Sequence, residues 1–206
     1  DTRRWLEQGA YSVGTFGSIY APDGSYNEGV SYAHYTTLHL IQALEALKIA
    51  GVMDMTDMLN WQGYQDYLLE MTLPAKDDLK ATVNFSDAST GGHASVSYWI
   101  ARKTRDGVAQ WFGNTLAVSR DLWSVLYLDT TVHATPPVAG THLWKSDLEW
   151  LVGRTGYDTD DLVVAMRSGP PFNHEHADRN GMILKCFGER LVVDPMRPPY
   201  ARLDAS

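Results

Sequence analysis

The chain changes its hydrophobic pattern once along its length, and this change limits the folds that are open to it. From about residue 28 to residue 128, apolar residues recur at the spacing of amphipathic helices. Beyond about residue 140 they form short runs broken by turn residues, which is typical of antiparallel strands. The sequence therefore predicts an α+β fold in two parts, with residues 1–135 helical and residues 136–206 forming an antiparallel sheet.

Four helices are predicted in the first part. The first carries an apolar stripe and ends near Gly51, a residue type that commonly follows a helix. Asp54 is expected to cap a second helix that Pro74 stops. Two further helices are predicted at residues 92–102 and 120–128.

Four strands are predicted in the second part, at residues 148–152, 162–166, 181–187 and 190–193. Four strands are too few to cover both faces of a sheet. We therefore expect the chain to be incomplete at both ends and to belong to a longer polypeptide.

Composition excludes some classes of partner. The formal net charge is −8 and no run of Lys and Arg occurs, which argues against nonspecific binding to nucleic acid. There is no apolar stretch of about eighteen residues, so we expect no membrane span. No signal peptide is found within the 206 residues.

One short segment concentrates residues that bind metals or transfer protons. If it is extended, His174, His176 and Asp178 point to one face, while Asn173 and Glu175 point to the other. The flanking segments read as strands, so this group is expected to lie on a sheet. The remaining histidines show no partner pattern and are expected to be structural: His34, His39, His93, His133 and His142.

A second group lies near the amino end. A turn at residues 22–24 precedes a helix on which Tyr32, Tyr35 and His39 share one face. A free phenol has a pKa of about 10 and is a poor base unless positive charge or a metal lies close to it. Tyr26 and Tyr35 compete with Tyr32 for a role in proton transfer.

Several motifs occur in a particular order along roughly residues 20 to 197. They are Asp23-Gly24-Ser25, Glu28-Gly29, Tyr32, Arg167-Ser168-Gly169, His174-x-His176-x-Asp178, and Gly188 with Leu191-Val192-Val193-Asp194. In this order and spacing they resemble the heparinase II/III-like polysaccharide lyases. The resemblance implies that residues 1–135 are the C-terminal part of an α/α toroid. Residues 136–206 would then be the N-terminal part of an antiparallel β-sandwich, with the active cleft between the two.

The resemblance also implies an activity. Such lyases cleave uronate-containing polysaccharides, such as heparan sulfate or alginate, by β-elimination. The uronate carboxylate is neutralised, a base removes the C5 proton, and an acid protonates the departing glycosidic oxygen. Tyr32 and His174 match the catalytic pair of the family. The expected partner is an acidic polysaccharide or oligosaccharide, contacted by Glu28, Tyr35, Arg167 and Asn173.

A zinc ion is the implied cofactor. His176 and Asp194 match two of its ligands, and a third histidine ligand is expected beyond the end of this chain. Two protein ligands alone would leave zinc under-coordinated. The asparagine–histidine pair that precedes the catalytic tyrosine in the family has no equivalent before Tyr32. The resemblance further implies a periplasmic or secreted full-length protein, and it leaves a homodimer open.

Two other classes of function compete with the lyase. His-x-His-x-Asp also opens the metal motif of metallo-β-lactamase-like hydrolases, but that motif continues with histidine, whereas this chain has Arg179. A helix directly after Asp178 would favour such a metal-dependent hydrolase. The third class is a non-catalytic carbohydrate-binding or scaffold protein, which a large separation between Tyr32 and His174 would favour.

Overall fold

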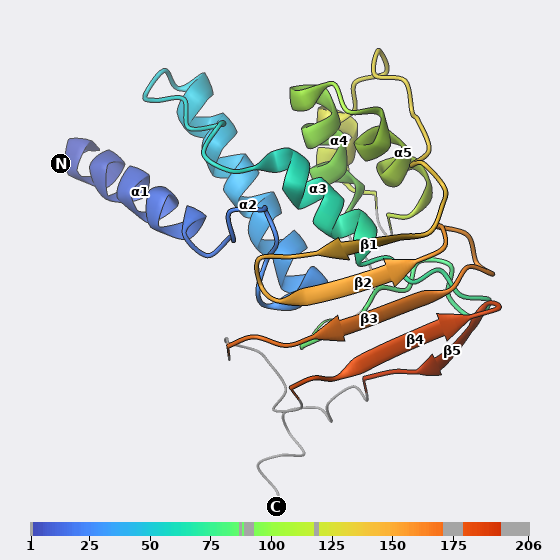
Figure 1. Ribbon diagram of the computed structural model, residues 1–206. Coiled ribbons are helices and arrows are strands. Elements are labelled where there is room, and N and C mark those ends of the chain that lie inside the picture. The colour runs from blue at the N-terminus through green and yellow to red at the C-terminus, as the bar shows by residue number, and fades with distance from the viewer. Residues whose placement is uncertain (1, 87, 89–92, 118–119, 171–178, 195–206) are drawn as a thin grey trace, which may run out of the picture.

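The computed structural model describes residues 2–86, 88, 93–117, 120–170 and 179–194 (Figure 1). Its helices are α1 (Thr2–Gly17), α2 (Gly29–Ile49), α3 (Trp61–Glu70), α4 (Ala94–Thr104), α5 (Gly107–Thr115) and α6 (Leu122–Tyr127). Its strands are β1 (His142–Lys145), β2 (Trp150–Arg154), β3 (Val163–Arg167), β4 (Met182–Cys186) and β5 (Glu189–Val192). The predicted α+β class, with helices first and an antiparallel sheet second, is confirmed.

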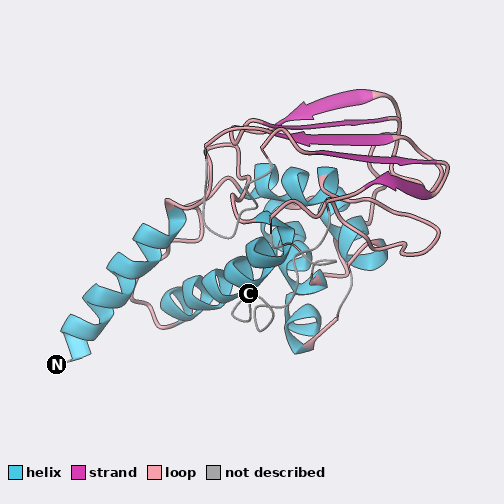
Figure 2. Ribbon diagram, turned by 90° about the horizontal axis from the view of Figure 1, so that it is seen from below, coloured by secondary structure: helices cyan, strands magenta, loops and turns pink. Residues whose placement is uncertain are grey.

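The five strands form one antiparallel sheet in chain order, β1-β2-β3-β4-β5. Helices cover one of its faces (Figure 2). Because side chains alternate along a strand, β2 and β3 each turn every second residue towards the helices. These inward residues include Trp150, Val152, Val163 and Ala165, all fully buried.

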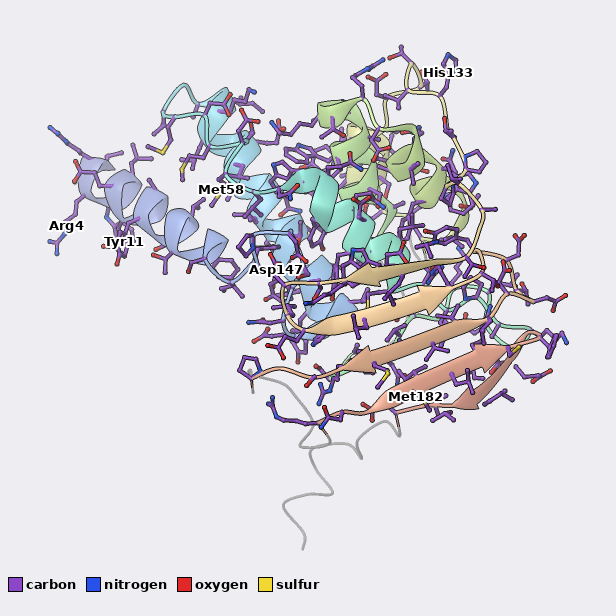
Figure 3. The ribbon with its side chains drawn as sticks, viewed as in Figure 1. Arg4, Tyr11, Met58, His133, Asp147 and Met182 are labelled. Carbon is purple, nitrogen blue, oxygen red and sulfur yellow. The ribbon has the colours of Figure 1, made fainter. Side chains whose placement is uncertain are left out.

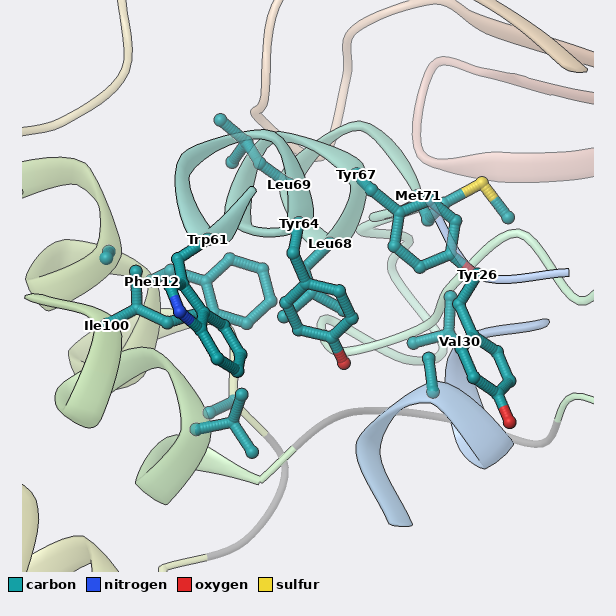
Figure 4. Close-up of a cluster of buried hydrophobic side chains, with 14 of the residues drawn as sticks. Tyr26, Val30, Trp61, Tyr64, Tyr67, Leu68, Leu69, Met71, Ile100 and Phe112 are labelled. Carbon is teal, nitrogen blue, oxygen red and sulfur yellow. The ribbon is translucent and has the colours of Figure 1, made fainter. Parts of the chain in front are cut away.

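The helical and strand parts share one hydrophobic core. The rings of Phe85 and Trp150, one from each part, meet edge to face with centroids 5.6 Å apart. Tyr67 of α3 also contacts Trp150, with centroids 6.4 Å apart. Figure 4 shows Tyr67, Tyr64 and Trp61 on one side of α3, within the cluster of buried side chains. The division of the chain into two domains, at residues 1–135 and 136–206, remains a prediction.

The second predicted helix starts later than expected. α3 begins at Trp61, and the side chain of Asn60 caps it by accepting a hydrogen bond from the Gly63 N–H at 2.9 Å. The prediction that Asp54 caps this helix was wrong. Asp54 instead accepts bonds from the backbone and hydroxyl of Thr56, a local turn that competes with helix formation.

Three elements were not predicted: α1, α5 and β1. α5 starts with Gly107 and contains Gly113, and glycine has low helix propensity. α1 buries none of its residues, and Figure 3 shows Arg4 and Tyr11 extending outward from it. Within the described residues, no helix has both the length and the apolar character needed to cross a membrane.

Candidate active site at one end of the sheet

Strand direction brings two of the predicted site residues to the same end of the sheet. β3 and β5 both pair antiparallel with β4, so they run in the same direction. β3 ends at Arg167, and Asp194 follows two residues after β5. We call this the site end of the sheet.

A segment between α3 and α4 contacts both strand ends. Asn84 donates its side-chain N–H to the carbonyl of Asp194 at 2.9 Å, and Arg167 donates to the Ser86 hydroxyl at 3.1 Å. We call residues 84–86 the connecting segment. It also lies against the start of α2, because a Cβ added to Gly29 would come within 2.7 Å of the Phe85 carbonyl oxygen. The start of α2 and the ends of two strands therefore converge here.

The turn that precedes α2 is fixed to the rest of the protein. Asp23 and Asp147 exchange hydrogen bonds, each backbone N–H donating to the other's carboxylate at 3.1 and 2.8 Å. Gly24 has φ of +89°, and a Cβ there would lie 2.3 Å from the Tyr64 nitrogen. Only glycine fits this close approach. The Asp-Gly-Ser motif therefore docks the start of α2 onto α3 and onto the turn between β1 and β2, where Figure 3 labels Asp147.

Burial separates the three candidate tyrosines. Tyr26 is 2% exposed and hydrogen-bonds to Thr36 and to Glu28, each at 3.2 Å. Burial and the nearby Glu28 carboxylate together raise the pKa of Tyr26 to about 12, against the hydrogen bond with Thr36, which lowers it. Tyr35 is exposed, whereas Tyr32, in the first turn of α2, is partly buried against the core. Tyr32 therefore lies in the helix start that takes part in the convergence and is not locked in the interior as Tyr26 is.

Arg167 occupies a different environment from the one predicted. It was expected to contact substrate, but it is 2% exposed, and its guanidinium lies 5.8 Å from the Phe85 ring centroid. Its bond to Ser86 joins β3 to the connecting segment. This placement favours a role in holding the site end together over direct contact with a polymer.

The predicted histidine motif lies outside the described residues, and so do Asn173, His174 and His176. Its flanks are described. Ser168, after β3, donates its backbone N–H to Glu149 at 3.1 Å, and Arg167 donates its own to Gly181 at 3.2 Å. The chain therefore leaves β3 and rejoins β4 at the site end. A turn and strand β4 follow the motif, where the hydrolase alternative required a helix.

One predicted metal ligand is described. Asp194 is largely buried, and its backbone is held by Asn84. Across the described parts of the chain, no group of three or more His, Cys, Asp or Glu residues could hold a metal ion. Asp194 is therefore the one residue of the predicted zinc site that lies within the described part of the chain.

The opposite end of the sheet holds a polar cluster that sequence reasoning missed. Glu70, the last residue of α3, accepts hydrogen bonds from Tyr157 at 2.7 Å and His142 at 3.0 Å and pairs with Arg154 at 3.1 Å. Arg154 also donates to the carbonyls of Glu70 and Thr72 at 2.7 and 2.8 Å. Burial lowers the pKa of Arg154, and the Glu70 carboxylate opposes this shift. The cluster joins α3 to β1 and β2.

His34, which was expected to be structural, lies in the interior. It is 1% exposed, and neither ring nitrogen has a hydrogen-bond partner among the described residues. Burial lowers the pKa of His34 to about 3, and nearby His93 adds to the shift. The imidazole is therefore neutral at physiological pH. His142 belongs to the Glu70 cluster, a contact that the sequence did not predict.

Comparison with known proteins identifies the fold. No family model matches the chain, and no curated protein does. The chain is similar in structure to heparan sulfate lyase HepC from Pedobacter heparinus, with TM-scores of 0.63 for a mutant and 0.62 for the other structure, each at 15% identity. The chain is covered completely and spans 31% of that lyase. The structure of a heparinase III gene product is also similar, with a TM-score of 0.52 and 17% identity. The match covers 92% of this chain and 29% of the heparinase III chain. The chain therefore has the heparinase-like polysaccharide lyase fold, over a stretch that runs from helices into the antiparallel sheet.

Proposed function

We propose that the chain forms part of a polysaccharide lyase that cleaves a uronate-containing polysaccharide by β-elimination. The observation that carries this proposal is the convergence, at one end of the sheet, of the start of α2 with the ends of β3 and β5. Tyr32 belongs to that helix start, and His174 belongs to the segment that joins β3 to β4. The fold shared with heparan sulfate lyase HepC and heparinase III supports the same function.

The proposed reaction needs two proton transfers. A base takes the C5 proton of the uronate, and the electrons of that C–H bond form a double bond between C4 and C5. The C4–O bond breaks, and an acid gives a proton to the departing glycosidic oxygen. Tyr32 and His174 are proposed for these two transfers, without an assignment of which is the base. Among the tyrosines of the turn and of α2, burial disfavours Tyr26 for either role.

The remaining residues extend the proposal to substrate and cofactor. Glu28, Tyr35 and Asn173 are proposed to contact the sugar chain, and Tyr35 is 65% exposed, so its ring is available for stacking. His176 and Asp194 are proposed to contribute to a zinc site. Alginate or a glycosaminoglycan is the proposed class of substrate. A periplasmic or secreted location and a homodimer belong to the same proposal.

The experiment uses the full-length gene product with a panel of uronate polymers. Cleavage by elimination should release products that absorb in the ultraviolet because they carry an unsaturated uronate. Replacing Tyr32 with Phe should abolish turnover and leave substrate binding nearly unchanged, because only the hydroxyl is lost. Tyr11→Phe, on the exposed α1 helix, is the matched control and should retain full activity.

Two outcomes would contradict the proposal. Reducing ends without ultraviolet absorbance would indicate hydrolysis. Binding of the polymers with no cleavage by the wild-type protein would indicate a carbohydrate-binding protein.

A further inference from the structure

The connecting segment reaches two different strands with two polar side chains. Asn84 holds the carbonyl of Asp194, beyond β5, and the Ser86 hydroxyl receives a hydrogen bond from Arg167, at the end of β3. The two hydrogen bonds join residues that are 110 and 81 positions apart along the chain. Both bonds therefore cross from the helical part to the sheet.

The connecting segment is itself fixed to the helical part. Just before it, Val83 donates its backbone N–H to Met71 at 2.7 Å, and Thr72 and Thr82 form an isolated antiparallel bridge. Phe85 is 1% exposed and packs on Trp150. Because the Phe85 carbonyl leaves no room for a side chain at Gly29, the segment also limits how closely α2 approaches the sheet.

The backbone of Ser86 has an unusual conformation. Its φ is +64°, although the residue is not glycine, and the side chain is 2% exposed. Such a conformation is unfavourable for a residue with a Cβ and persists only where the surrounding contacts enforce it. The hydrogen bond from Arg167 is one of those contacts.

We propose that Asn84 and Ser86 are positioning residues that set the spacing between the start of α2, which carries Tyr32, and the strand ends that carry Arg167 and Asp194. This inference rests on the proposed function, since the spacing matters for a reaction only if groups from both parts act on one sugar. Catalysis depends steeply on such distances, and a misplacement of about 1 Å can lower a rate by about a hundredfold.

The test compares Asn84→Ala and Ser86→Ala with Tyr157→Phe in the full-length gene product. Tyr157→Phe removes one hydrogen bond to Glu70 at the opposite end of the sheet and serves as the control for a general loss of stability. We expect each of the first two variants to lower kcat by about tenfold or more with KM changed by less than about threefold. Tyr157→Phe should leave kcat unchanged.

Hydrogen exchange provides a second readout that does not need activity. Amide protection at residues 33–36, which form the first hydrogen-bonded turn of α2, and at the end of β5 should fall in Asn84→Ala and Ser86→Ala but not in Tyr157→Phe. If the wild-type protein is an active lyase and Asn84→Ala and Ser86→Ala keep a normal kcat, the positioning role of Asn84 and Ser86 is refuted, while the proposed function stands. An equal loss of kcat in Tyr157→Phe would refute that role as well. A wild-type protein that forms no unsaturated product would refute the proposed function, and the assignment with it.

Discussion

Removal of the Glu70 carboxylate should destabilise the protein strongly, because it would leave a buried positive charge without its counter-ion. The Arg154 side chain is 0% exposed and that of Glu70 is 7% exposed, so water cannot replace the lost partner. Breaking a buried ion pair from one side typically costs about 3–5 kcal/mol. The perturbation we consider is Glu70→Ala.

The contacts of Arg154 place the expected loss within that range. Its guanidinium keeps two short bonds to the carbonyls of Glu70 and Thr72, which are backbone groups and survive the substitution. The loss of unfolding free energy that comes from the unpaired Arg154 charge should therefore lie at the lower end of the 3–5 kcal/mol range, at about 3 kcal/mol. Tyr157 also loses its acceptor at 2.7 Å, and a hydrogen bond contributes about 1 kcal/mol. The total expected loss is about 4 kcal/mol.

Urea denaturation measures this loss through the midpoint, provided that the m-value stays constant. The double variant Glu70→Ala/Arg154→Met removes both charges, so its loss should be smaller than the sum of the losses in Glu70→Ala and Arg154→Met, since no charge remains buried alone. Glu7→Ala breaks an exposed pair with Arg3 and serves as the control, with little change expected. A loss below about 1 kcal/mol for Glu70→Ala, or a double variant whose loss equals the sum of the two single losses, would refute the reasoning.

Two further predictions concern buried groups outside the site. Lys185 is 0% exposed and donates to the carbonyls of Pro74, Asp158 and Thr159 at 2.9, 3.0 and 2.8 Å. Lys185→Met would leave these buried acceptors without a donor, so the free energy of unfolding in urea should fall by about 3 kcal/mol. A wild-type midpoint in that variant would contradict it. The pKa of His34 falls from 6.5 to about 3 on folding, so the unfolded chain binds more protons between these values and stability should decline as pH is lowered through this window. His34→Leu should weaken that pH dependence, and an unchanged slope would show that other groups cause it.

Local patterns in the sequence predicted those elements whose stabilising contacts are also local. The apolar stripe of α2 is visible because residues three and four apart share a helix face. Gly51 follows that helix with φ of +66°, as its residue type suggested. Asp54 misled the prediction because aspartate caps helices and closes turns with the same side-chain bond, and only the structure distinguishes the two uses.

The parts that could not be predicted depend on residues distant in the chain. Glu70 and His142 are 72 positions apart, and Asp23 and Asp147 are 124 apart, so no local pattern marks either contact. Likewise, residue type and local pattern do not show that Tyr26 is buried and Tyr32 only partly so, because burial depends on packing against the rest of the fold. The turn at Asp23 was readable from its residue types, but its attachment to the sheet was not.

The continuous core has a consequence for movement between the helical and strand parts. Enzymes built from two independent domains often admit substrate by swinging one body away from the other about a hinge. Here such a movement would pull Trp150 away from Phe85 and Tyr67 and wet a large aromatic surface. The helical and strand parts should therefore move as one body instead of opening about a hinge between them.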